Sequence, residues 1–394
     1  MASAAPSAAR TTAPTLPPAS TATPDATATP APTATHDLAT PDPSAEPTAV
    51  APLSTQLAEA ADFMPPKAQQ LFFTDWSAIK RAIGEEDVTS QSPLEERIAV
   101  SAATIKPEAA PSGFGLRYLR THADLWSFDT MDLAWEATIQ GPPGFPTWVL
   151  RFREGFDLSP VAARFDQRAF STERLEGAVL REHELDLSQD WVRGSELAIT
   201  NTAFLDDGRT LVASSDPEAV RAVVAYALDP GAKTLPFLAV IESLEDASGA
   251  ILLSGAGTCE FIAPIALEPD VLERVQEELA AAGPLSAYDA LGVGYSSAWD
   301  PAGRIVFAYA DPEAAAADLS GRASLADTGT SVRFARPYAE SAFTLEATEH
   351  RATHEATGMG GSAVTLQVAP TNAMPRRLFD MVISRDMLFA ACPP

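Results

Sequence analysis

The sequence predicts an α+β fold made of two ββαββα halves, each an antiparallel sheet covered by helices on one face, with a helical connector and a disordered N-terminal stalk. Three observations lead to this prediction. Apolar residues alternate with polar ones in some stretches and recur every three or four residues in others, which are the spacings of strands and helices. Pairs of predicted strands are repeatedly followed by a helix. One sequence pattern occurs in both halves, at Gly208–Ala219 and at Gly303–Ala314.

Residues 1–55 form the predicted stalk. Met1 to Leu53 are mainly Ala, Thr, Pro and Ser, with no aromatic residue. Such a segment buries too little apolar surface to offset the entropy lost on ordering it, and its prolines hold the chain extended. We therefore expect a solvated spacer in front of the folded body.

Residues 56–127 form a predicted N-terminal helical segment. Thr74 or Asp75 is placed to cap a helix that Gly84 ends. The run Ser92-Pro93-Leu94-Glu95 combines a capping box with a proline at the first helical position. A third short helix is expected over 116–125.

Residues 128–230 form the first predicted α+β half. Two alternating stretches, 131–139 and 147–153, flank a Gly/Pro turn and predict a hairpin. The remaining predicted elements of this half are a helix over 159–165, strands within 177–185 and 197–214, and a helix over 217–228.

Residues 231–284 are predicted to be a helical connector, with helices over 237–254 and 270–282. Residues 285–394 form the second half. Its expected strands are 291–297, 304–309, 343–351 and 363–368, with helices starting at Pro312 and spanning 375–389.

The pattern shared by the two halves is G-R-x-x-x-A-x-x-D-P-E-A. Gly permits the hairpin turn, Asp caps the following helix and Pro takes its first position. A single match can also arise by convergence on a common turn. Because the flanking hairpins correspond as well, we interpret it as duplication.

The net charge of −26 excludes some partners. Phosphate backbones and anionic lipid surfaces repel such a chain, and no Lys/Arg cluster is present, so we expect no nucleic-acid binding. The sequence has no apolar run of 18 residues and no recognisable signal peptide. The composition of the stalk favours an extracellular or cell-envelope location, with contact to a membrane only through an N-terminal anchor that this chain lacks. The alternative is a cytoplasmic protein with a disordered tail.

The two cysteines, Cys259 and Cys392, are a candidate disulfide, because an even pair in an exported protein favours a bond. The alternative is two buried, reduced thiols.

A candidate metal site comprises His350, His354 and Glu355. Two imidazoles four residues apart and a carboxylate are ligands that zinc accepts. The H-x-x-x-H spacing lacks the inner Glu of the zinc-protease helix, so a solvated strand end is the stronger interpretation.

A candidate ligand site comprises Trp126, Trp135 and Trp148, which lie around the first hairpin. Aromatic rings can line a groove or stack against a sugar, although an aromatic stripe is more often core. Nucleophile and phosphate-loop motifs are absent; Gly292-Val293-Gly294-Tyr295-Ser296, for example, does not match G-x-S-x-G. We expect no cofactor.

Two stretches, 71–76 and 126–138, resemble a loose group of uncharacterised bacterial secreted or lipid-anchored proteins that carry a low-complexity stalk. The first stretch has the sequence LFFTDW, and the second contains WSFD and then DLAWEAT. The resemblance implies an envelope location and no assigned activity. This chain departs from the lipoprotein pattern because it has no N-terminal Cys.

We therefore expect a non-catalytic envelope or extracellular protein that binds an envelope protein, a polysaccharide or a small ligand in a cleft between its halves. The alternative is an extracellular hydrolase with an unrecognised, metal-dependent site around His350.

Overall fold

The computed structural model describes residues 55–103, 110–141, 146–229, 238–255, 258, 268–295, 302–352, 362–371 and 377–392. All of these belong to one compact unit, Pro52–Pro394. The predicted stalk lies outside the described residues apart from its last position, so its disorder stays a prediction.

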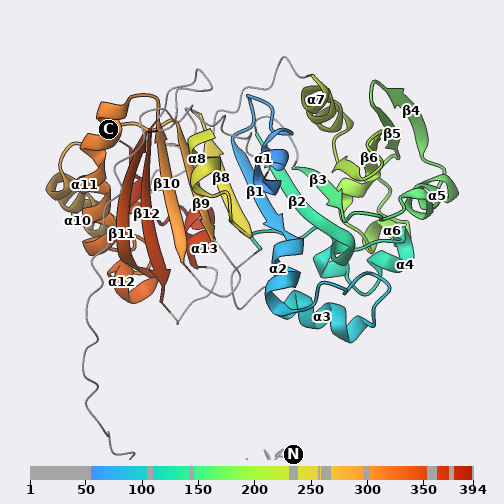
Figure 1. The fold of residues 1–394 in the computed structure, drawn as a ribbon, viewed down its shortest axis with the longest axis horizontal. Coiled ribbons are helices and arrows are strands. Elements are labelled where there is room, and N and C mark those ends of the chain that lie inside the picture. The colour runs from blue at the N-terminus through green and yellow to red at the C-terminus, as the bar shows by residue number, and fades with distance from the viewer. Residues whose placement is uncertain are drawn as a thin grey trace, which may run out of the picture. The chain divides into compact units, whose positions relative to one another are not determined.

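The described strands form one twelve-stranded sheet in which every neighbouring pair is antiparallel (Figure 1). The order across the sheet is β11-β12-β10-β9-β8-β1-β2-β3-β7-β6-β5-β4. The predicted α+β class is confirmed. The strands are β1 (Gln70–Asp75), β2 (Leu133–Gln140), β3 (Thr147–Phe152), β4 (Ser171–Leu175), β5 (Ala178–Glu182), β6 (Asn201–Leu205), β7 (Thr210–Ser214), β8 (Gly249–Ser254), β9 (Ala290–Tyr295), β10 (Gly303–Tyr309), β11 (Phe343–Ala352) and β12 (Ser362–Pro370).

Helices lie between these strands. Several match the sequence prediction; α7, for example, has the predicted bounds. The helices are α1 (Gln56–Ala61), α2 (Trp76–Ile83), α3 (Leu94–Ala103), α4 (His122–Trp126), α5 (Ser159–Gln167), α6 (Asp190–Arg193), α7 (Pro217–Leu228), α8 (Leu238–Ser243), α10 (Pro269–Ala282), α11 (Pro312–Thr328), α12 (Tyr338–Ser341) and α13 (Arg377–Ser384).

The prediction of two separate sheets is wrong, because β1 and β8 pair in the middle and join the strands into one sheet. Both strands lie in segments that we predicted to be helical. Leu71 and Phe73 of β1 are fully buried, and all of β8 is buried. Both strands contain consecutive apolar residues, which lack the alternation that identifies a strand in sequence.

Asp75, at the end of β1, caps α2 as the sequence predicts. Its carboxylate accepts a hydrogen bond of 2.7 Å from the Ala78 amide. Gly84 ends the helix with a φ of 74°, a left-handed conformation that glycine adopts without strain. The chain therefore leaves the sheet at Asp75 and turns directly into a helix.

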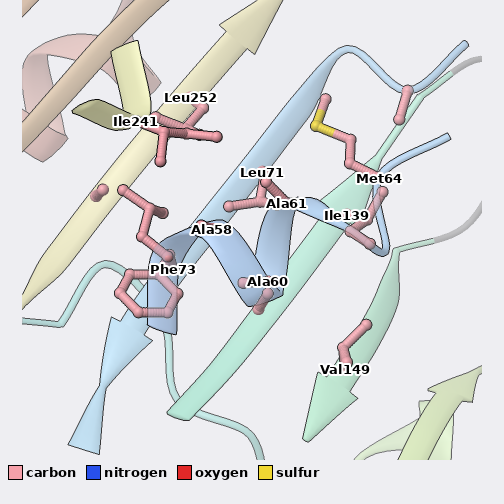
Figure 2. Packing of buried hydrophobic residues seen from close by; sticks show 14 of the residues in the cluster. Ala58, Ala60, Ala61, Met64, Leu71, Phe73, Ile139, Val149, Ile241 and Leu252 are labelled. Atoms are coloured by element: carbon pink, nitrogen blue, oxygen red, sulfur yellow. The ribbon is translucent and has the colours of Figure 1, made fainter. Parts of the chain in front are cut away.

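Helices cover both faces of the sheet, whereas we expected them on one face only. Buried residues of α1, α7 and α8 form one core cluster with one face of the sheet, and Figure 2 shows Ala58, Leu71, Ile241 and Leu252 within it. On the opposite face, α2, α4 and α5 pack over the first-half strands, and α10, α11 and α13 pack over the second-half strands.

The glycines of the Gly292–Ser296 motif have a packing role. A Cβ atom added at Gly292 would lie 2.2 Å from Cγ1 of Val240 and 2.9 Å from Cδ1 of Leu244, both on the α8 side of the sheet. Real Cβ atoms do not approach that closely, so α8 lies against β9 only because residue 292 lacks a side chain.

Replacing Gly292 with Ala is expected to destabilise the fold by about 1–3 kcal/mol, because the added methyl overpacks the contact with α8. Urea unfolding measures the change. In a double variant with Val240→Ala, the loss is expected to be smaller than the sum of the two single losses. Additive losses would contradict this account of the glycine.

Candidate functional site

An open pocket of about 380 Å³ lies over β1, β2 and β3 on the face covered by α2 and α4. We call it the Thr138 pocket. Its floor comprises Phe72, Thr138, Gln140 and Trp148. Its volume falls within the ordinary range for small-molecule sites, which is roughly 300–1,000 Å³.

The floor is a cross-strand row. Thr138 of β2 pairs with Phe72 of β1 on one side and with Trp148 of β3 on the other. All three side chains line the same pocket, so a hydroxyl lies between two partly buried aromatic rings. This arrangement follows from strand order and register, which place directly opposite residues on the same face of a sheet.

The hydroxyl of Thr138 has no hydrogen-bond partner among the described residues, although the residue is only 3% exposed. Buried polar side chains are nearly always paired, and an unpaired one costs about 1–3 kcal/mol. The hydroxyl oxygen is covered by protein atoms, so Thr138 offers its donor and acceptor to a ligand in the pocket when its side chain rotates toward that ligand.

One wall of the pocket is the segment that carries Pro111 and Ser112. Polar side chains of the sheet hold this segment. Glu136 of β2 accepts hydrogen bonds from the Phe114 amide at 2.8 Å and from the Ser112 hydroxyl at 3.4 Å. Thr74 of β1 donates to the Ser112 carbonyl at 3.1 Å.

The rim carries an ion pair. Arg117 lies on a short 3-10 helix, and its Nη2 is 2.6 Å from Oε2 of Glu196. Glu196 immediately precedes a second 3-10 helix. The Arg117 side chain is mainly exposed and that of Glu196 mainly buried. Leu197 adds an apolar side chain that is 40% exposed. The charged groups of the rim therefore largely neutralise each other.

Glu136 lies behind this wall and is completely buried. Burial raises the pKa of Glu136 to about 7, because desolvation of the carboxylate outweighs the stabilising hydrogen bond from the Phe114 amide. A carboxyl group with such a pKa resembles a general acid. Its side chain does not line the pocket, however, so its geometry suits an anchor for the wall.

Phe114 of the wall packs edge-on against Trp148 and against His122. His122 is fully buried, and its Nδ1 lies 2.9 Å from the Phe128 carbonyl oxygen. Burial lowers the pKa of His122 to about 4. A neutral imidazole therefore supports the back of the wall near neutral pH.

The structure does not bring the three predicted ligand-binding tryptophans together. Trp148 lines the Thr138 pocket. Trp126 is fully buried on α4 and donates to Ser195 at 2.6 Å, which is a core position. Trp135 lies on the opposite face of the sheet, because it is an odd number of residues from Thr138 on the same strand, and its indole donates to Glu59.

The metal and disulfide hypotheses stay predictions. His350 lies on β11 with its Nε2 2.6 Å from the Ser362 hydroxyl, while His354 and Glu355 lie outside the described residues. Within the described ranges, no group of three His, Cys, Asp or Glu side chains is placed to hold a metal ion. Cys392 packs against the second-half core, and Cys259 lies outside the described residues.

Most residues of the Thr138 pocket were not predicted from the sequence. Phe72 lay in the predicted helical segment 56–127, and Thr138 belonged to the polar face of the strand predicted over 131–139. Arg117 and Glu196 are far apart in sequence and carried no motif. The only available signal was the run Glu136, Thr138 and Gln140 along one face of β2, opposite the apolar face.

No protein-family model, curated protein or solved structure matches this chain. Among the described helices, none is both long and apolar enough to cross a membrane.

The variant Glu136→Gln tests the buried carboxyl group. The pKa of Glu136 is higher in the folded protein than in the unfolded chain. The protonated carboxyl group therefore contributes stability below pH 4.5, and this contribution is lost as the pH rises to about 7. The variant is therefore expected to match the wild type near pH 4.5 and to exceed its stability at pH 8, by at most about 3 kcal/mol.

Urea unfolding of both proteins at each pH measures this difference. His122 contributes the same pH dependence of stability to both proteins, so its contribution cancels in the comparison. The exposed Glu154→Gln is the control and is expected to change stability by less than about 0.5 kcal/mol at either pH. A Glu136→Gln effect that does not vary with pH would contradict the account.

Proposed function

We propose that the protein is a non-catalytic binding protein of the cell envelope or extracellular space that takes a small ligand in the Thr138 pocket. The observation that carries this proposal is the unpaired, buried hydroxyl of Thr138 between Phe72 and Trp148 at the base of an open pocket. A buried polar group without a partner costs stability, and a ligand that pairs with it recovers that cost.

The chemistry of the described lining favours binding over catalysis. The carboxylate of Glu196 pairs with Arg117, and the remaining polar floor and wall groups are hydroxyls and the Gln140 carboxamide. Glu136 accepts hydrogen bonds at both carboxylate oxygens and lies behind the wall. Paired groups of this kind orient a ligand rather than transfer protons to it.

We also propose that the body arose by duplication of a ββα unit, present twice in each half. The strand orders β1-β2-β3-β7-β6 and β8-β9-β10-β12-β11 support this proposal, since they run outward from the centre in the same succession, with the hairpin β4–β5 added in the first. Asp216 and Asp311 of the shared pattern both cap their helices. The helix that follows the hairpin β6–β7, α7, covers the face opposite to the one covered by α5, α11 and α13, so the correspondence holds for the strands and not for this helix. A crystal structure in which the two strand orders differ would contradict duplication.

The location outside the cytoplasm rests on the composition of residues 1–55 and on the resemblance to stalk-bearing bacterial proteins. An Ala/Thr/Pro-rich spacer holds a binding domain away from a surface. Cell fractionation tests this part of the proposal, and recovery of the protein from the cytoplasm alone would contradict it.

The isosteric variant Thr138→Val separates stability from binding. Because it removes an unpaired buried hydroxyl, it is expected to be at least as stable as the wild type, with a gain of up to about 1–3 kcal/mol. The same variant is expected to lose ligand binding by at least tenfold. Thermal-shift and NMR screening against a mixed library of neutral saccharides, nucleosides and dipeptides measures both properties.

The control is Thr348→Val, which removes an exposed threonine hydroxyl from β11. It is expected to leave binding unchanged. A library in which no compound distinguishes the wild type from Thr138→Val would contradict the proposed function.

A further inference from the structure

We propose that the ligand of the Thr138 pocket is a short, neutral saccharide. This inference rests on the proposed function of the same pocket and names the chemical class that its described residues suit. It follows from three features of the site: the spacing of the floor residues, the kind of polar groups present and the balance of charge.

The spacing of the floor suits a molecule with an apolar face and a hydroxylated edge. Phe72 and Trp148 stand on the two strands that flank Thr138, so their backbones are about 10 Å apart with the hydroxyl midway between them. A sugar ring can lay its C–H face against an aromatic ring while one hydroxyl reaches the strand between. Both rings are only partly buried, which leaves surface for that contact.

The polar groups of the pocket both donate and accept. Thr138, Ser112 and Ser215 contribute hydroxyls, and Gln140 contributes a carboxamide. Thr138, Ser215 and Gln140 can both donate and accept, as sugar hydroxyls do, and the Ser112 hydroxyl, which donates to Glu136, can accept. A purely apolar ligand would leave the Thr138 hydroxyl unpaired and would gain nothing from this set.

The charge balance favours a neutral ligand. Nη2 of Arg117 lies 2.6 Å from Oε2 of Glu196, so the two charges at the rim already neutralise each other. A ligand with phosphate or carboxylate groups would also approach a chain with a net charge of −26. Leu197, 40% exposed at the rim, adds apolar contact.

The test is isothermal titration of the full chain with neutral disaccharides, namely maltose, cellobiose and N,N′-diacetylchitobiose. Comparison ligands are a nucleoside, a dipeptide and glucuronate. We expect at least one neutral disaccharide to bind at least tenfold more tightly than glucuronate. Thr138→Val and Trp148→Leu are each expected to weaken that binding at least tenfold.

The control variant is Trp191→Leu, which removes a partly buried tryptophan that packs on Trp126 away from the pocket. It is expected to bind the disaccharide as the wild type does. Circular dichroism and the melting temperature show that each variant is folded before it is titrated.

The outcomes separate the two proposals. If the nucleoside or the dipeptide binds, is lost in Thr138→Val, and no saccharide binds, the saccharide inference is overturned while the proposed function stands. If a saccharide binds equally well to the wild type, Thr138→Val and Trp148→Leu, the pocket is not the site and both proposals fail. If none of these compounds binds, the saccharide inference is overturned.

Discussion

The pairing of β1 along both of its edges is the constraint on which the rest of this structure depends. β1 joins the first-half strands to the second-half strands, because β2 pairs with one edge and β8 with the other. Its register sets Phe72 opposite Thr138, and its alternation sends Leu71 and Phe73 into the core on the opposite face. Its last residue, Asp75, starts the helical cover, and burial raises the pKa of that carboxyl to about 6. One short strand therefore sets both the continuity of the sheet and the floor of the pocket.

The pocket is built from polar groups that a simple core would not contain. A fully buried carboxyl, Glu136, holds the wall, and an unpaired hydroxyl, Thr138, lies at the floor. Each costs stability relative to an apolar residue of the same shape. Proteins concentrate such costs where they bind or react, and these two residues lie two positions apart on one face of β2. Their shared position is the physical reason for assigning function to this part of the sheet.

The sequence predicted the strands in which polar and apolar residues alternate and the helices that carry local capping signals, and it failed where tertiary contacts decide. The alternation in β2 and β3 and the Asp-Pro start of α7 were sufficient to predict those elements. Runs such as Leu71–Phe73 and Ile251–Leu253 lay in segments predicted to be helical, because consecutive apolar residues do not show the alternation of a strand. The site was missed for a related reason: its residues come from three strands and two wall segments, so no local motif records it. Of the three predicted tryptophans, Trp148 lines the Thr138 pocket, Trp135 lines a separate pocket on the opposite face of the sheet, and Trp126 is part of the core.

A crystal structure determined from crystals grown with a neutral disaccharide tests most directly whether the Thr138 pocket binds a saccharide, because it shows what the Thr138 hydroxyl contacts. The account predicts a ligand hydroxyl at a hydrogen-bonding distance of about 2.8 Å from Thr138 Oγ1, with a sugar ring against Trp148. A structure in which the protein's own side chains fill the space between Phe72 and Trp148, and one of them bonds to Thr138, would contradict it.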